Sequence, residues 1–140
     1  MALSDLAQVL GGANKVAYAT SLQDVPNLRI VNFVWDETTP GILYFASVRD
    51  SQGVQEFLAS KRIAFSTVPE TGNAHVASNH ATGQKSQRTL AQMQAQFLAQ
   101  VPGFDHVLDL IGAKLALYEI QMTSAEVDLG LGNGIKQLKF

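Results

Sequence analysis

Cysteine is absent from the 140-residue sequence. This absence excludes disulfides, thiolate metal sites and cysteine nucleophiles, and it is compatible with a reducing compartment. Charge is also scarce, since ten Lys and Arg residues and twelve Asp and Glu residues leave a net charge of −2. The basic residues are spread along the chain and predict no basic face, so we expect no nucleic acid partner.

Long apolar runs are missing as well. No stretch of about eighteen apolar residues occurs, which argues against a membrane span. The first six residues, Met-Ala-Leu-Ser-Asp-Leu, carry neither a basic side chain nor a long apolar run, and so they do not resemble a secretion signal. We therefore expect a cytoplasmic protein without a membrane partner.

The signatures of several enzyme classes are absent too. The sequence has no Gly-x-Ser-x-Gly motif, no phosphate loop and no close carboxylate pair with an assignable role, so the catalytic residues stay unknown. His75 and His80 would face opposite sides of one strand, and His106 stands alone on a helix, so no metal site is predicted. The glycines of residues 130–134 are wrongly spaced for a dinucleotide fingerprint, and a hairpin explains them.

The sequence does contain enough apolar material for one folded domain over residues 1–140. Hydrophobic residues make up 46% of the chain, and a chain of this length can bury about two-thirds of its extended surface. Alternation and turn residues predict strands over residues 15–22, 28–36, 42–48, 63–68, 75–84, 115–122, 127–131 and 135–140. Helical spacing and capping residues predict helices over residues 4–10, 51–61, 89–101 and 105–111.

The order of these elements indicates the class of fold. Neighbouring strands are joined by short polar segments, such as residues 23–27 and 36–40, and Asn133-Gly134 is a strong hairpin signal. No strand–helix rhythm repeats along the chain. This order favours a mainly β fold with minor α, built as a small antiparallel barrel or an α+β sheet, over a doubly wound parallel sheet.

The predicted strand over residues 28–36 has large apolar side chains on both faces. Its faces carry Leu28, Ile30 and Val34 on one side and Val31, Phe33 and Trp35 on the other. A strand covered on one side would alternate with polar residues, so we expect two covers here. The core supplies one, and the other is a helix, a second subunit or a planar cofactor.

The next strand runs into a group of polar side chains. Ser47, Arg49 and Ser51 lie between the end of this strand and the start of a predicted helix. A helix N-terminus with hydroxyls and an arginine beside it is suited to binding a phosphate. The same hydroxyls are also common at strand ends and helix caps, so a purely structural interpretation stays open for them, as it does for Arg29 as a surface charge.

Together these segments resemble the pyridoxamine 5′-phosphate oxidase-like flavin-binding split barrels. The matching residues are Arg29-Ile-Val-Asn-Phe33, Leu43-Tyr-Phe-Ala-Ser47, Ser51, Val54 and Arg62-Ile-Ala-Phe-Ser66. The resemblance is clear over residues 15–69 and weaker up to residue 122. It implies an antiparallel split β-barrel with short helices between the strands.

The resemblance also implies a homodimer that holds a flavin, usually FMN, in a cleft between subunits; the family admits haem and deazaflavin as well. The implied cofactor-binding residues are Arg29, Ile30, Val31, Asn32, Phe33, Ala46, Ser47, Arg49, Ser51 and His75. Residues 29–33 would run along the isoalloxazine ring, and Ser47, Arg49 and Ser51 would surround the phosphate. His75 would contact the ring or a neighbouring subunit.

Two features depart from the family pattern. Gly53 stands where the family commonly places a lysine, and Gln52 precedes it in place of an arginine. A phosphate dianion would lose one or two charge-assisted bonds, each of about 1.5–3 kcal/mol, with Arg49 the nearest substitute. The chain also ends at Phe140 without the tryptophan- and arginine-containing motif of true pyridoxamine-phosphate oxidases, so vitamin B6 oxidation is not expected.

Three functions follow from the resemblance. The first is an FMN-dependent oxidoreductase that exchanges electrons or hydride with a small-molecule donor or acceptor. The second is a non-enzymatic binding protein for flavin, haem or another planar ligand. The third is a structural or regulatory dimer without cofactor, which Gly53 favours. A flavin carries its own redox chemistry, so the sequence of a flavoenzyme need not display a catalytic acid or nucleophile.

Overall fold

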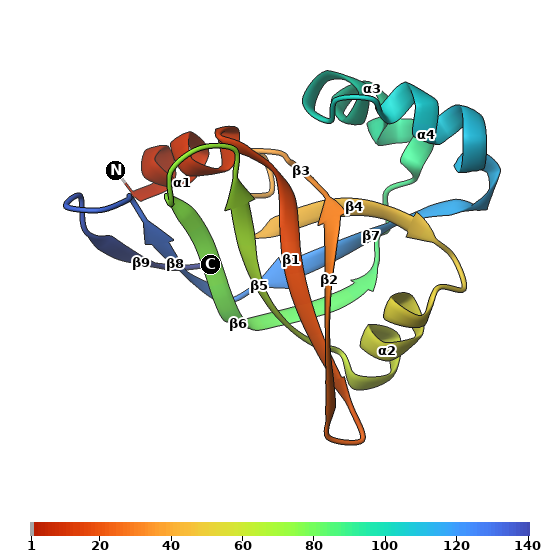
Figure 1. The fold of residues 1–140 in the computed structure, drawn as a ribbon, viewed down its shortest axis with the longest axis horizontal. Coiled ribbons are helices and arrows are strands. Elements are labelled where there is room, and N and C mark those ends of the chain that lie inside the picture. Colours follow the sequence, from red (N-terminus) through yellow and green to blue (C-terminus); the bar gives the residue numbers. More distant parts are fainter. Residues whose placement is uncertain (1) are drawn as a thin grey trace.

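The computed structural model describes residues 2–140 as one mainly β unit with four α-helices (Figure 1). In chain order the elements are α1 (Ala2–Gly11), β1 (Ala13–Leu22), β2 (Val25–Asn32), β3 (Val34–Trp35), β4 (Ile42–Val48), α2 (Gln52–Ser60), β5 (Arg62–Pro69), β6 (His75–Lys85), α3 (Leu90–Gln100), α4 (Phe104–Ile111), the short 3-10 helix η1 (Gly112–Lys114), β7 (Leu115–Met122), β8 (Ser124–Asp128) and β9 (Ile135–Lys139).

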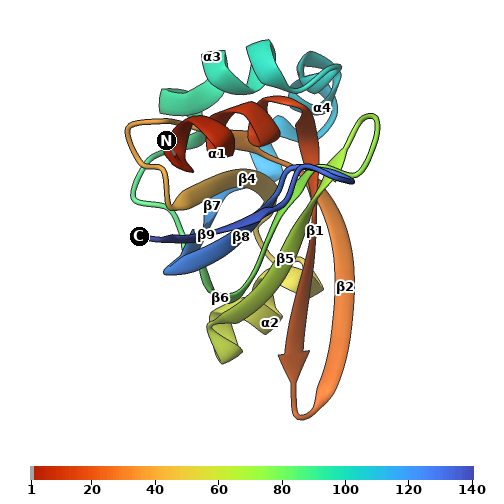
Figure 2. The same ribbon diagram turned by 90° about the vertical axis from the view of Figure 1, so that its left-hand side faces the viewer.

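Every strand pairing is antiparallel, and the strands form one curled sheet in the order β2-β1-β5-β6-β7-β4-β3. The eleven-residue β6 pairs with β5 over residues 77–82, and it also pairs with β8 over residues 75–77 and with β7 over residues 81–85. Strand β9 extends the sheet beyond β8. Figure 2 shows the curl, with the β1–β2 hairpin projecting beyond it. This is the antiparallel split barrel with inserted helices that the sequence predicted.

The main core fills the inside of the curled sheet. Four aromatic residues lie at its centre, where the ring centroids of Phe45 and Phe57 are 5.9 Å apart and those of Phe57 and Tyr118 are 5.6 Å apart. Tyr18 completes the group, 5.5 Å from Phe45. Helices α1 and α2 contribute apolar residues to this core from opposite ends of the sheet (Figure 1).

A second core lies on the outer face of β4, under α3 and α4. Tyr44 belongs to this core, whereas its neighbours Leu43 and Phe45 face the barrel interior, and all three are at most 2% exposed. Strand β4 is therefore covered on both faces.

The expectation that residues 28–36 form one continuous strand is wrong. The segment divides at Phe33, whose N–H donates to the carbonyl of Asn14 at 3.0 Å, and Phe33 and Val34 enter different cores. Before this break the chain is β2, at an edge of the sheet, where Leu28 is 71% exposed and Ile30 is 63% exposed. The alternating pattern correctly indicated apolar side chains on both faces of this segment. Because the strand breaks at Phe33, some of these side chains lie in the two cores and others are exposed on β2.

Several predicted boundaries also shift. The first turn contains only Gln23 and Asp24, both with positive φ, so that β2 already begins at Val25. The last hairpin is confirmed, but β8 ends at Asp128, and a loop over residues 129–134 replaces the expected continuation of the strand. Most of the other predicted elements agree with the observed ones to within two residues.

None of the helices within residues 2–140 combines the length and the apolar character needed to cross a bilayer.

Candidate functional site

The N-terminus of α2 faces a small group of hydroxyls. Ser51 is the N-cap, in extended conformation, and its Oγ accepts a hydrogen bond from the Val54 N–H at 3.4 Å. The Oγ of Ser47, at the end of β4, lies 3.4 Å from the Oγ of Ser51. The structure therefore brings together two of the predicted phosphate ligands beside the first backbone N–H groups of α2, which have no partner within the helix.

Arg29 reaches this helix from β2 and lies over Gly53. A Cβ atom on Gly53 would be 2.8 Å from Cδ of Arg29, 2.9 Å from its Nε and 2.6 Å from Oη of Tyr18. No side chain fits at position 53 while Arg29 and Tyr18 keep these positions. A side chain at position 53 would therefore require Arg29 or Tyr18 to move, and Arg29 lies where a lysine at this position would begin.

The charge of Arg29 is balanced by a buried carboxylate. Its Nη1 lies 2.9 Å from Oε1 of Glu56, a residue only 5% exposed. Thr20 donates to the same oxygen at 3.0 Å, and Asn27 donates to Oε2 at 2.8 Å. The amide of Gln52 is 3.5 Å from Oε2. Glu56 therefore has four donors drawn from β1, β2 and α2.

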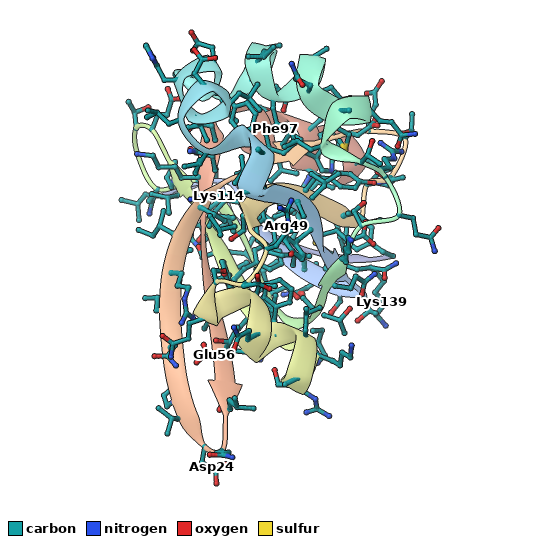
Figure 3. The ribbon with its side chains drawn as sticks, turned by 90° about the vertical axis from the view of Figure 1, so that its right-hand side faces the viewer. Asp24, Arg49, Glu56, Phe97, Lys114 and Lys139 are labelled. Atoms are coloured by element: carbon teal, nitrogen blue, oxygen red, sulfur yellow. The ribbon has the colours of Figure 1, made fainter. Side chains whose placement is uncertain are left out.

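Sequence analysis missed Glu56. The available signal was its position on α2, because Glu56 follows Gly53 by one helical turn and precedes Phe57 on the face that α2 buries. A carboxylate on that face needs a partner inside the fold. In Figure 3 Glu56 lies on α2 beside the β1–β2 hairpin, which supplies three of its four donors.

The side chain of Arg49 donates hydrogen bonds to backbone carbonyl groups in η1 and at the start of β7. Its Nη1 donates to the carbonyl of Leu115 at 3.3 Å, and its Nη2 donates to that of Ala113 at 3.0 Å. The backbone N–H of Arg49 also donates to the carbonyl of Lys114 at 3.1 Å. Figure 3 shows Arg49 beside Lys114 and away from Glu56. The guanidinium thus ties the β4–α2 connection to the start of β7.

The remaining predicted ring contacts lie along the open edge of the sheet. Ile30 points to solvent, Val31 and Asn32 are half-buried, and the side chain of Phe33 is in the main core. Within residues 2–140 β2 shares a ladder with β1 alone, and its other side approaches β4, which carries Ala46. The backbone of this strand can therefore offer donors and acceptors to a ligand at the edge.

The structure does not bring His75 to the same place. His75 begins β6, and its Nδ1 lies 2.6 Å from the carbonyl oxygen of Asn73. Strand β5 begins at Arg62, directly after α2, and Arg62 pairs with Thr82 near the end of β6. His75 begins β6, so it lies at the other end of the β5–β6 pair, away from α2. Within one chain His75 is separated from Ser47 and Ser51 by the length of β5.

Burial affects two tyrosine hydroxyls at the site. Burial raises the pKa of Tyr18, whose hydroxyl lies over Gly53, and of Tyr118, whose hydroxyl donates to the carbonyl of Arg49 at 3.4 Å. Both phenols therefore stay protonated at neutral pH, so that they can act as hydrogen-bond donors and carry no charge.

The site is an open surface in the single chain. None of the five cavities described for residues 2–140 is lined by Arg29, Ser47, Arg49 or Ser51, although Asn32 contributes to one of them, beside Lys15 and Pro102. Another of them, of about 450 Å³, is lined by residues of β5, β6, β8 and β9, including His80. Nor do three His, Asp or Glu side chains of the described chain converge as a metal site.

Comparisons with known proteins identify a family and a common fold. A family model described as pyridoxamine 5′-phosphate oxidase-like matches residues 9–134. No curated protein sequence matches the chain. Similar solved structures include a haem-binding protein from Mycobacterium smegmatis, General Stress Protein 26 from Bacillus anthracis str. Sterne and an FAD-binding protein from Mesorhizobium loti.

These three structures share the fold at low sequence identity. The Mycobacterium smegmatis protein has a TM-score of 0.75 and 13% identity, covering 99% of this chain, which spans only 58% of that protein. General Stress Protein 26 has a TM-score of 0.72 and 12% identity, over 99% of this chain and 98% of its own. The Mesorhizobium loti protein has a TM-score of 0.62 and 12% identity, over 85% and 88%.

Proposed function

The chain belongs to the pyridoxamine 5′-phosphate oxidase-like family, and from this premise we propose that it binds a flavin, FMN in the first instance, between two copies of itself. The bound flavin would exchange electrons or hydride with a small-molecule donor or acceptor. The observation that carries the proposal is the juxtaposition of the open β2 edge with the hydroxyl-bearing N-terminus of α2.

The residues at this edge suit different parts of a flavin. The backbone of residues 29–33 offers donors and acceptors to the polar edge of the ring, and Ala46 lies on the neighbouring strand. Ser47, Ser51 and the first N–H groups of α2 suit the oxygens of the ribityl phosphate. Similarity of fold to an FAD-binding protein supports a flavin ligand.

The chain would act by binding and orientation. A bound flavin supplies the redox chemistry. Arg29 and Tyr18 hold the first turn of α2 in place, and Arg49 holds the connection that leads into it. The protonated phenols keep additional negative charge away from the ligand.

An apolar stripe on β2 supports association of two chains. Leu28 is 71% exposed and Ile30 63%, both on the same face of this edge strand, and Val25, at its start and on the other face, is 58% exposed. Burying each of these side chains would contribute about 1.5–3 kcal/mol, and a second copy would also supply the missing wall of the site. We propose a homodimer with this strand in its interface.

The proposal is tested by spectroscopy and by one surface substitution. We expect the purified protein to absorb near 370 and 450 nm, as free flavin does at roughly these wavelengths, or to take up about one FMN per chain in a titration followed by Trp35 fluorescence. Bleaching by NADH or NADPH would support turnover. A colourless protein that ignores FMN would refute flavin binding.

The dimer is tested by Leu28→Lys, with Leu131→Lys as the matched control. Leu131 is 88% exposed on the loop before β9, away from β2. We expect Leu28→Lys to elute as a monomer in size-exclusion chromatography and to lose flavin, whereas Leu131→Lys stays dimeric. Unchanged elution and flavin content of Leu28→Lys would place the interface elsewhere.

A non-enzymatic binding protein for haem or another planar ligand is the second candidate. Its support is similarity of fold to a haem-binding protein from Mycobacterium smegmatis. Titration with haemin separates the two functions, because a saturable shift of the haem absorption band without flavin uptake would favour this candidate.

A further inference from the structure

The two arginines predicted at the entrance to α2 are both engaged inside the protein. Arg29 is paired with Glu56, and the guanidinium of Arg49 donates to two carbonyl groups on the other side of the β4–α2 connection. Position 53 cannot supply a further cation, because Arg29 and Tyr18 leave no room for a side chain. The N-terminus of α2 is left with its own partial charge.

Glu56 holds Arg29 in this paired state. Transfer of the guanidinium from Glu56 to a ligand phosphate would leave a carboxylate that is only 5% exposed without its counter-charge. The carboxylate cannot follow the guanidinium, because Thr20 and Asn27 also donate to it, at 3.0 and 2.8 Å. A phosphate that approached the paired Arg29 would meet the negative charge of Glu56 at the same time.

Gly53, Arg29 and Glu56 therefore belong to one arrangement. The missing side chain at position 53 lets Arg29 cross the first turn of α2, and the carboxylate one helical turn later receives its guanidinium. Glycine in place of the family lysine at position 53 is thus accompanied by the ion pair between Arg29 and Glu56. This ion pair uses Arg29 inside the protein instead of presenting it to a ligand.

We propose that Glu56 determines ligand specificity by neutralising Arg29, so that the site does not select its ligand by a phosphate dianion and accepts dephosphorylated flavin, such as riboflavin, about as readily as FMN. The ligand class rests on the proposed flavin function. The role of Glu56 as the residue that keeps Arg29 from a phosphate can be tested without any flavin.

The first experiment uses inorganic phosphate as the probe. Glu56→Gln removes the negative charge but keeps an acceptor for Arg29 and Thr20, and the amides of Asn27 and Gln52 can turn to accept from its NH₂ group. The matched control is Glu37→Gln, which changes the net charge equally at an exposed position in the turn before β4. Thermal unfolding is followed in phosphate and in chloride of equal ionic strength.

We expect phosphate to raise the melting temperature of Glu56→Gln, relative to chloride, by several degrees more than those of the wild type and Glu37→Gln, which should show only the general stabilisation that phosphate gives to folded proteins. Equal stabilisation of the wild type and Glu56→Gln would overturn the proposal. So would the absence of stabilisation in all three proteins, since Glu56 would then not be what prevents phosphate binding.

The second experiment compares FMN with riboflavin. We expect the wild type to bind the two within about 10-fold of each other, and Glu56→Gln to gain at least about 10-fold for FMN with little change for riboflavin. A wild-type preference for FMN above about 100-fold would overturn the proposal even if the variant failed to fold. If neither flavin bound to any of the proteins, the flavin function would fall, and the phosphate experiment would still decide the role of Glu56.

Discussion

Gly53→Ala tests whether packing requires the glycine at the start of α2. An alanine in a helix is ordinarily more stable than a glycine by up to about 1 kcal/mol. At this position, however, the added Cβ would lie 2.6 Å from Oη of Tyr18 and 2.8 Å from Cδ of Arg29. The ring of Tyr18 is held between Phe45 and Phe57, and Arg29 is held by Glu56, so neither neighbour can retreat freely.

The expected effect is a net loss of stability. Overpacking of a filled site costs about 1–3 kcal/mol, and three contacts below 3.0 Å place Gly53→Ala at the upper end of this range. After subtraction of the helix-propensity gain, the free energy of unfolding should fall by about 2 kcal/mol. For a chain of this length that corresponds to a fall in melting temperature of about 7 °C.

Urea and thermal unfolding followed by circular dichroism measure this effect. Gly11→Ala is the control, because no atom lies within 4 Å of its added Cβ, and we expect that variant to be at least as stable as the wild type. In a Tyr18→Phe background the closest contact is absent, so the cost of Gly53→Ala should drop below about 1 kcal/mol. Gly53→Ala with wild-type stability would refute the packing argument.

Three further substitutions test contacts around the fold. The hydrogen bond from Arg88 is the main cause that lowers the pKa of Asp36 to about 2. A lowered pKa adds stability that is fully present above about pH 4 and is lost as the pH falls through 2, so Asp36→Asn should cost up to about 1 kcal/mol at pH 7 and progressively less toward pH 2 in urea unfolding. Arg49→Ala should lower the free energy of unfolding by about 1–2 kcal/mol, because two hydrogen bonds to carbonyl groups are lost; equal urea midpoints for variant and wild type would contradict this. Thr89→Ala should cost about 1 kcal/mol, because the capping box with Gln92 is broken, and calorimetry that detects no change would show that the cap is dispensable.

Features that depend on short stretches of chain were predictable from the sequence. Ser51 caps α2, at the start of the helix predicted there, because an N-cap bonds to backbone groups only two or three residues further along. The hairpin at Asn133-Gly134 was predictable for the same reason, although its loop is longer than two residues. The family resemblance likewise rested on the local pattern of strands over residues 15–69, and it led to the correct fold.

The environment of the site was not predictable in the same way. Arg29 was identified as a site residue, but its partner Glu56 comes from an element more than twenty residues later, and no periodicity links the two. Arg49 was expected near the phosphate, and nothing in the sequence indicated that its guanidinium donates to the carbonyl groups of residues 113 and 115. His75 was expected at the ring or at a neighbouring subunit, and within one chain the length of β5 separates it from Ser47 and Ser51.

The sequence by itself determined the type of each main element, the caps and turns that bound them, and the membership of the split-barrel family. These properties depend on side-chain alternation and on hydrogen bonds between near neighbours. Only the tertiary structure decided that β4 is covered twice while β2 lies at an open edge, and that Glu56 takes up the charge of Arg29. Those outcomes depend on which distant strands pair and on which buried charges meet, and residues far apart in the chain determine both.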